Sequence, residues 1–126
     1  MPTNSRPASD AADLSGTVKE WGIELSSATS TSGEVSIGLT NGGTMPHEFI
    51  VVRTDLTTEE LLVMVDSALN RLDESSLDVA GEQLEFAPGE VKLLTLDLSP
   101  GKYTVLCNIA GHFSNGMHAS LEILAN

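Results

Sequence analysis

Three side chains with affinity for soft metal ions lie close together near the end of the sequence. Cys107, the only cysteine, is followed by His112 and Met117 at intervals of five residues each. Thiolate and imidazole groups are good ligands for copper, zinc or iron, whereas a thioether binds only soft or borderline metals such as copper. The spacing therefore predicts a metal site within one short segment and favours copper.

A fourth ligand is expected from a distant part of the chain. His47 opens the apolar run HEFIVV, which is typical of a strand buried on both faces, and it follows the turn-like segment TNGGTMP. Cys107 ends another predicted strand, KYTVLC, so both residues can lie at the same end of the strands. Two imidazoles and a thiolate in one plane, with a long weak bond to methionine, describe a mononuclear copper site for electron transfer.

The elements that must position these residues are predicted mainly as strands, because apolar residues alternate or form short apolar runs between glycine and proline turns. The strands are expected over residues 17–27, 34–40, 47–54, 91–99, 102–107 and 119–125. Residues 80–90 are interpreted as turns. Several short strands of this kind predict an all-β fold, an antiparallel Greek-key sandwich or barrel.

One helical insertion is expected around residues 58–72. Apolar residues recur there at helical intervals. They are Leu61, Leu62, Val65, Leu69 and Leu72. Thr57 is a candidate N-cap with Glu60 three residues later, and Arg71 in the last turn suits the helix dipole.

Length and charge limit the classes of partner. The 126 residues fit one domain, expected over residues 16–126 after a flexible polar tether at 1–15. Eighteen acidic residues against six basic ones give a net charge of −12, which argues against nucleic acid and anionic membrane surfaces as partners. The charge is compatible with a cationic protein partner, and it is equally explained as a surface that keeps a monomer soluble.

With these ligands in view, the sequence resembles the cupredoxins, the type 1 blue-copper proteins. The resemblance covers roughly residues 16 to 125 and rests on His47 followed by Cys107-x4-His112-x4-Met117, loop spacings similar to those of rusticyanin and auracyanin. It implies one copper ion that cycles between Cu(I) and Cu(II), with these four residues as its ligands. It also implies that His112 reaches the surface and is the exit for the electron.

Two positions depart from the common cupredoxin pattern. Ala110 stands where many family loops carry a proline, and Glu48 stands where several members carry an asparagine that supports the site. Asn41 or Asn108 could supply the missing hydrogen bonds to the Cys107 sulfur.

An apolar collar is expected around His112 as a docking patch for a partner. Its residues are Met45, Pro46, Ile109, Ala110 and Phe113.

The interpretation that follows is a carrier of single electrons between redox protein partners, not an enzyme. A Cys–His pair also occurs in cysteine hydrolases, but no orienting group, oxyanion hole or cleft is identifiable. Zinc could bind the same groups, but a closed site leaves no open position for catalysis. A copper-binding protein for delivery or detoxification, or a sandwich that has lost its metal, remains open. The location expected is extracytoplasmic, periplasmic or at the cell surface, with an anchor through a removed N-terminal segment left open.

Overall fold

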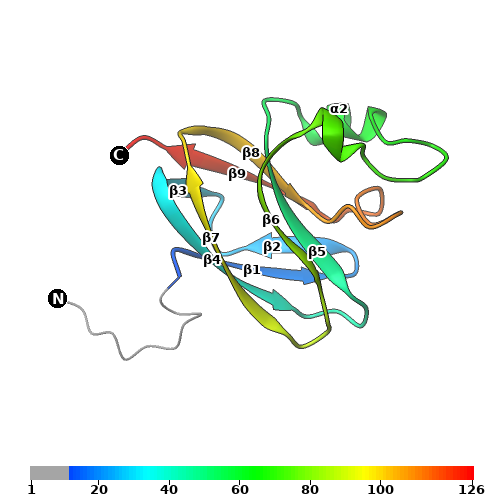
Figure 1. Ribbon diagram of the computed structural model, residues 1–126, viewed down its shortest axis with the longest axis horizontal. Coiled ribbons are helices and arrows are strands. Elements are labelled where there is room, and N and C mark those ends of the chain that lie inside the picture. The colour runs from blue at the N-terminus through cyan, green and yellow to red at the C-terminus, as the bar shows by residue number, and fades with distance from the viewer. Residues whose placement is uncertain (1–11) are drawn as a thin grey trace.

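Two β-sheets packed face to face form the structure, a computed structural model that describes residues 12–126 (Figure 1). One sheet contains β1 (Leu14–Lys19), β2 (Gly22–Leu25), β4 (Gly33–Asn41) and β7 (Val91–Leu98), in the order β2-β1-β4-β7. The other contains β3 (Thr29–Thr31), β5 (His47–Arg53), β6 (Asp78–Phe86), β8 (Gly101–Leu106) and β9 (His118–Leu124), in the order β3-β9-β8-β5-β6. The expected β-sandwich is confirmed.

The pairing of the strands is mostly antiparallel, as predicted, with two exceptions. β1 lies parallel to β4, and β3 lies parallel to β9, so both sheets are mixed. β1 begins at Leu14, two residues before the expected start of the domain. Residues 1–11 of the predicted tether lie outside the described residues.

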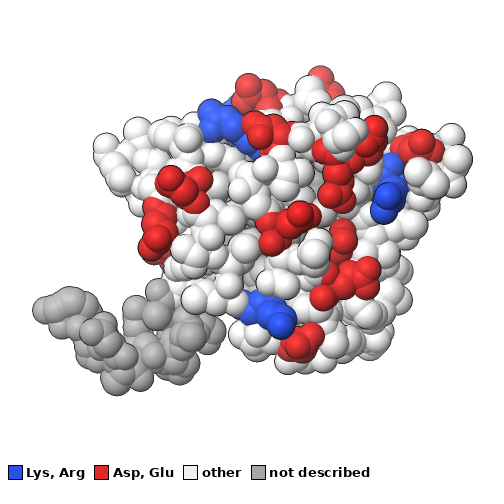
Figure 2. Space-filling model, viewed as in Figure 1, with Lys and Arg blue, Asp and Glu red and all other residues white. Residues whose placement is uncertain are grey.

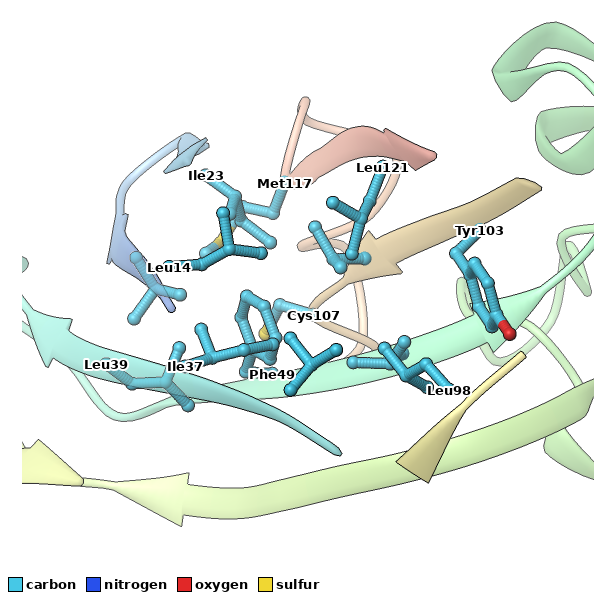
Figure 3. Close-up of a cluster of buried hydrophobic side chains, with 14 of the residues drawn as sticks. Leu14, Ile23, Ile37, Leu39, Phe49, Leu98, Tyr103, Cys107, Met117 and Leu121 are labelled. Atoms are coloured by element: carbon cyan, nitrogen blue, oxygen red, sulfur yellow. The ribbon is translucent and has the colours of Figure 1, made fainter. Parts of the chain in front are cut away.

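The main hydrophobic core lies between the two sheets. Alternate residues of β1 and β4 point inward, as the period of two in a strand requires, and they meet residues of β5, β8 and β9. Figure 3 shows that this core includes Cys107 and Met117 together with Phe49, Ile23 and Leu121. Two of the predicted metal ligands are therefore also core residues, so the packing of the sandwich fixes where they lie.

The helical insertion is present but shorter than predicted. α2 covers Thr58–Val63, and the expected capping box at its start is confirmed. The N–H of Glu60 donates to Thr57 Oγ1 at 3.1 Å, and the N–H of Thr57 donates to Glu60 Oε1 at 2.8 Å. Among residues 12–126, no helix has the length and apolar character to span a bilayer.

Turns replace the helix after Val63 because polar side chains offer the backbone other partners. The Asp66 carboxylate accepts the N–H groups of Ala68 and Leu69, at 2.8 and 3.0 Å, and Asn70 has a left-handed φ of 55°. A short 3₁₀ helix, η1 (Glu74–Ser76), then leads into β6.

A second, smaller core lies under this insertion, on the outer side of β5 and β8. Its buried residues are Ile50, Val52, Leu61, Leu72, Leu106 and Phe113. The insertion thus covers part of a sheet face that would otherwise meet solvent.

β6 was expected as turns, and that interpretation is wrong. The strand lies at the edge of its sheet and pairs antiparallel with β5, with irregular register next to His47 and between Val51 and Val52. Glu82, Leu84 and Glu85 are all exposed, and the adjacent exposed pair Leu84 and Glu85 interrupts the alternation by which a half-buried strand is identified.

Candidate metal centre

The four predicted ligands come from two places in the fold. His47 is the first residue of β5. Cys107 directly follows β8, Met117 directly precedes β9, and His112 lies in the turns between them. β8 and β9 pair antiparallel, and the N–H of Cys107 donates to the carbonyl of Met117 at 3.1 Å, so the two ends of the loop are held side by side.

Three donor atoms converge at this end of the sandwich. His47 Nδ1 lies 3.2 Å from His112 Nδ1, and the latter lies 3.4 Å from Cys107 Sγ. One donor atom from each of the three residues lies within 4.8 Å of the others. Met117 is fully buried in the same core cluster as Cys107.

Burial sets the protonation of the free donor groups. His47, Cys107 and Met117 are fully buried, and His112 is 7% exposed. Desolvation raises the pKa of Cys107 to about 11, although the N–H of Glu48 opposes the shift. Desolvation, followed by the proximity of His47, lowers the pKa of His112. The metal-free site therefore holds a thiol and, at His112, a neutral imidazole whose lone pair is available to a metal.

The Cys107 sulfur accepts a hydrogen bond from the backbone, not from an asparagine side chain. The N–H of Glu48 donates to Sγ at 3.3 Å. The side chains of Asn41 and Asn108 make their hydrogen bonds elsewhere, so neither substitutes in the way the sequence suggested. The Glu48 carboxylate accepts the N–H of Asn108 at 3.1 Å, which ties the start of β5 to the residue after Cys107.

Asn41 holds the segment that leads into His47. Its Nδ2 donates to the carbonyls of Met45 and Phe86, at 3.0 and 2.9 Å, and its Oδ1 accepts the N–H of Gly43 at 2.8 Å. Because Asn41 is buried, these bonds fix the path of residues 42–46 and hence the position of His47.

Asn108 holds the other side of the site against the insertion. Its Oδ1 accepts the N–H of Leu72 at 2.9 Å, and its Nδ2 donates to the Leu72 carbonyl at 3.0 Å and to Glu74 Oε2 at 2.9 Å. Nearby, the N–H of Gly111 donates to the Asn70 carbonyl at 2.7 Å. The loop therefore gains support beside Ala110 from the insertion instead of from a proline.

Two residues of the β1–β2 turn contact the site and escaped the sequence analysis. Glu20 Oε2 forms a short contact with His47 Nε2, and its Oε1 accepts the N–H and the hydroxyl of Thr44 at 2.8 and 2.6 Å. The Thr44 hydroxyl, then His47, lower the pKa of Glu20 to about 2. The ring of Trp21 meets that of His112 edge to face, at 5.0 Å between centroids. No local sequence pattern predicts these contacts, because they arise from the packing of a turn against the opposite sheet.

The predicted apolar collar is only partly at the surface. Phe113 is 1% exposed and packs in the second core, so its assignment to the docking patch is wrong. Pro46 and Ala110 are exposed, and Met45 and Ile109 are half-buried. The physical reason is the insertion, which covers the side of the loop from which Phe113 projects.

Comparison with known proteins identifies the family. The family model for the sulfocyanin (SoxE) domain matches residues 5–126. The chain belongs to the sulfocyanin family. No protein among curated sequences matches this sulfocyanin domain significantly.

Solved structures of auracyanins and of an azurin share the fold of this chain. Reduced auracyanin from Roseiflexus castenholzii has a TM-score of 0.66 at 17% identity, with 86% of this chain and 94% of that chain covered. Auracyanin A from Chloroflexus aurantiacus, a "blue" copper protein, has a TM-score of 0.64 at 20% identity, with 86% and 95% covered. An azurin from Methylomonas sp. strain J has a TM-score of 0.56 at 17% identity, with 86% and 95% covered. The cupredoxin fold of the sulfocyanin domain is thereby confirmed.

The donor set fits a single copper ion. Two imidazole nitrogens and one sulfur converge among buried residues, and Met117 brings a buried thioether into the core cluster that contains Cys107. Nitrogen and thiolate donors of this kind suit copper. The copper cofactor predicted from the sequence is confirmed by this cluster and the family match.

Proposed function

We propose that this sulfocyanin domain carries single electrons between redox proteins, with its copper ion held by His47, Cys107, His112 and Met117. The observation that carries the proposal is the convergence of His47, Cys107 and His112, whose donor atoms lie within 4.8 Å of one another, with His112 Nδ1 3.2 Å from His47 Nδ1 and 3.4 Å from Cys107 Sγ. The copper ion supplies the Cu(I)/Cu(II) couple when it is bound, and no catalytic reaction is assigned to the domain.

The protein's own residues supply a dry and fixed set of donors. Cys107 would hold the metal as its thiolate, and the N–H of Glu48 donates a hydrogen bond to the same sulfur in this structure. The β5–β6 and β8–β9 ladders hold His47 and the two ends of the loop, so the donors need not move when the charge of the site changes by one. A site that does not reorganise is suited to rapid electron transfer.

The docking surface that we propose is centred on Trp21, not Phe113. Trp21 is 45% exposed and lies against His112, which is itself almost covered. Exposed Pro46 and Ala110, with half-buried Met45 and Ile109, complete the apolar surface. Figure 2 shows acidic side chains spread over the face in view, with few basic ones. The net charge of −12 supports a cationic redox partner. We propose further that the protein is a monomer that works outside the cytoplasm, in the periplasm or at the cell surface.

A copper titration tests the proposal. Purified protein should bind one Cu(II), develop an intense visible sulfur-to-copper band and show a reversible one-electron couple. Cys107→Ser should lose the band, because a hydroxyl is a harder and far less acidic ligand. Thr104→Ser, a small change on the adjoining strand, is the control and should keep it. A wild-type protein without an intense band would contradict the proposal.

Kinetics separate electron transfer from copper delivery. Fast electron self-exchange with retention of the metal supports an electron carrier. Transfer of copper to a chelating acceptor, without fast self-exchange, supports copper delivery. For the docking surface, Trp21→Ala should slow electron transfer to a protein acceptor at every ionic strength, since apolar contact is not screened by salt. Leu93→Ala, an exposed apolar residue on β7, is the matched control.

A further inference from the structure

We infer that Glu20 is a positioning residue for the metal site: its carboxylate orients the His47 ring and lowers the reduction potential of the bound copper. This inference rests on the proposed function. The contact joins the β1–β2 turn of one sheet to the first residue of β5 in the other, 27 positions apart in sequence.

The two nitrogens of His47 face different partners. Nε2 contacts Glu20 Oε2, and Nδ1 lies 3.2 Å from His112 Nδ1 on the side of the predicted metal. An ionised carboxylate can only accept hydrogen bonds, so the ring proton must sit on Nε2, which leaves the lone pair of Nδ1 free for the metal. A ligand histidine oriented by a carboxylate in this way is also the more basic ligand.

The carboxylate is itself held in place. Its Oε1 accepts both the N–H and the hydroxyl of Thr44, so both oxygens are engaged and Glu20 does not behave as a mobile surface acid. Gly43 leaves the room for this pair, because a Cβ at that position would collide with the Glu20 carboxylate and lie 2.9 Å from His47 Nε2. The local sequence Gly43–Thr44 thus forms a cradle for the contact between the acid and the ring.

The charge of Glu20 acts on the two oxidation states unequally. The Glu20 side chain is only 16% exposed, so solvent screens its charge less than that of a surface acid. A fixed negative charge hydrogen-bonded to a ligand stabilises the more positive Cu(II) state more than Cu(I). The reduction potential of the bound copper is therefore lower with an ionised Glu20 than with an uncharged residue at this position.

Three variants separate charge from position. Glu20→Gln removes the charge but keeps an acceptor, and Glu20→Ala removes both. Glu24→Gln on β2 is the control with the same change in net charge, since Glu24 pairs with Lys19 at the surface at 3.2 Å. Each is measured as the potential of the copper-loaded protein and as the His47 tautomer of the metal-free protein by ¹⁵N NMR.

Glu20→Gln should weaken Cu(II) binding relative to Cu(I) about tenfold, which raises the potential by about 59 mV for a one-electron couple. Glu20→Ala should show the same rise and, in addition, a mixture of His47 tautomers without metal. Thr44→Val, which keeps the carboxylate and removes one of its hydrogen bonds, should shift the potential in the same direction by a smaller amount and guards against a Glu20 variant that fails to fold.

A potential that shifts no more in Glu20→Gln than in Glu24→Gln would overturn the charge effect. A single Nε2–H tautomer retained in Glu20→Ala would overturn the positioning role. If the wild-type protein binds no copper, the proposed function fails, but the tautomer of His47 in the metal-free variants still decides whether Glu20 orients the ring.

Discussion

Two buried asparagines hold the two halves of the metal site, and they do so in different surroundings. Asn41 fixes the segment before His47, within a region bounded by the ladders of β4, β5 and β6. Asn108 fixes the Cys107 loop against residues 64–77, which consist mostly of turns. Each amide makes three hydrogen bonds, but the bonds of Asn41 lie among backbone ladders, whereas those of Asn108 reach Leu72 and Glu74 in the insertion, outside any ladder.

The metal site is therefore expected to be rigid around Asn41 and able to open around Asn108. Removing a contact in the ladder half disturbs strands that unfold with the whole domain, whereas removing one in the loop half can release the insertion alone. We therefore expect the Asn41 half to report on global stability and the Asn108 half on local opening.

Asn41→Ala should have the largest effect. It removes the Asn41 hydrogen bonds of the buried Phe86 carbonyl and of the part-buried Met45 carbonyl and Gly43 N–H, which costs about 3 kcal/mol in the free energy of unfolding. Chemical denaturation measures this. Asn126→Ala, which removes one exposed hydrogen bond to the Ser32 carbonyl, should cost far less. Equal losses in the two variants would contradict the role of Asn41.

Asn108→Ala should lower the global free energy of unfolding by about 1–2 kcal/mol, because the orphaned groups of Leu72 can reach water when the insertion opens. Hydrogen exchange should accelerate in residues 64–77 well before it does in β5 and β8. Asn115→Ala, whose Nδ2 donates to the Gly111 carbonyl at 2.7 Å on the exposed side of the same loop, is the control. Hydrogen exchange that accelerates equally across the domain would contradict a difference between the two halves.

Asn70→Ala tests the left-handed turn on which the loop rests. The φ of 55° disfavours a Cβ-bearing residue that lacks a local hydrogen-bonding side chain, at about 1 kcal/mol. Asn70→Gly relieves that strain and should stay close to wild type, although it also loses the exposed hydrogen bond from Ser114. If the glycine variant loses as much stability as the alanine variant, the side-chain contact matters more than the backbone.

Glu90 gives the smallest expected effect and belongs to the Asn41 half. The N–H of Ala87, then Lys92, lower the pKa of Glu90 below its ordinary value of 4.5. Because the unfolded chain binds the proton more tightly, Glu90 stabilises the fold above pH 4.5, and this contribution disappears as the pH falls through the folded pKa. Glu90→Gln should be slightly less stable than wild type at neutral pH, and the two denaturation curves should converge in acid.

The three proposed ligands in the loop could be predicted from the sequence. Cys107, His112 and Met117 lie within a few residues of one another between two recognisable strands, so their proximity follows from chain connectivity alone. His47 could be added because a strand start fixes its place. The assignment of all four as ligands stays a prediction. The clustered donor atoms support His47, Cys107 and His112, and the burial of Met117 in the core cluster of Cys107 is compatible with the fourth.

Contacts between distant segments could not be predicted in the same way. Glu20 and Trp21 reach the site only because the β1–β2 turn packs against β5 and the loop, and no periodicity encodes that. Phe113 was misplaced for a related reason: whether a loop phenylalanine faces solvent depends on what covers it, here Leu61 and Leu72 from the insertion.

The closure of the ligand loop by the β8–β9 hairpin has an evolutionary consequence. Leu106 pairs with His118, and the N–H of Cys107 donates to Met117, so three of the four proposed ligands lie in one segment with fixed end points. Exposed residues within that segment can be inserted, deleted or exchanged without altering strand register, because the hairpin tolerates a loop of different length. Variation confined to this segment could therefore alter the metal's electronic properties while selection on the sandwich continues undisturbed.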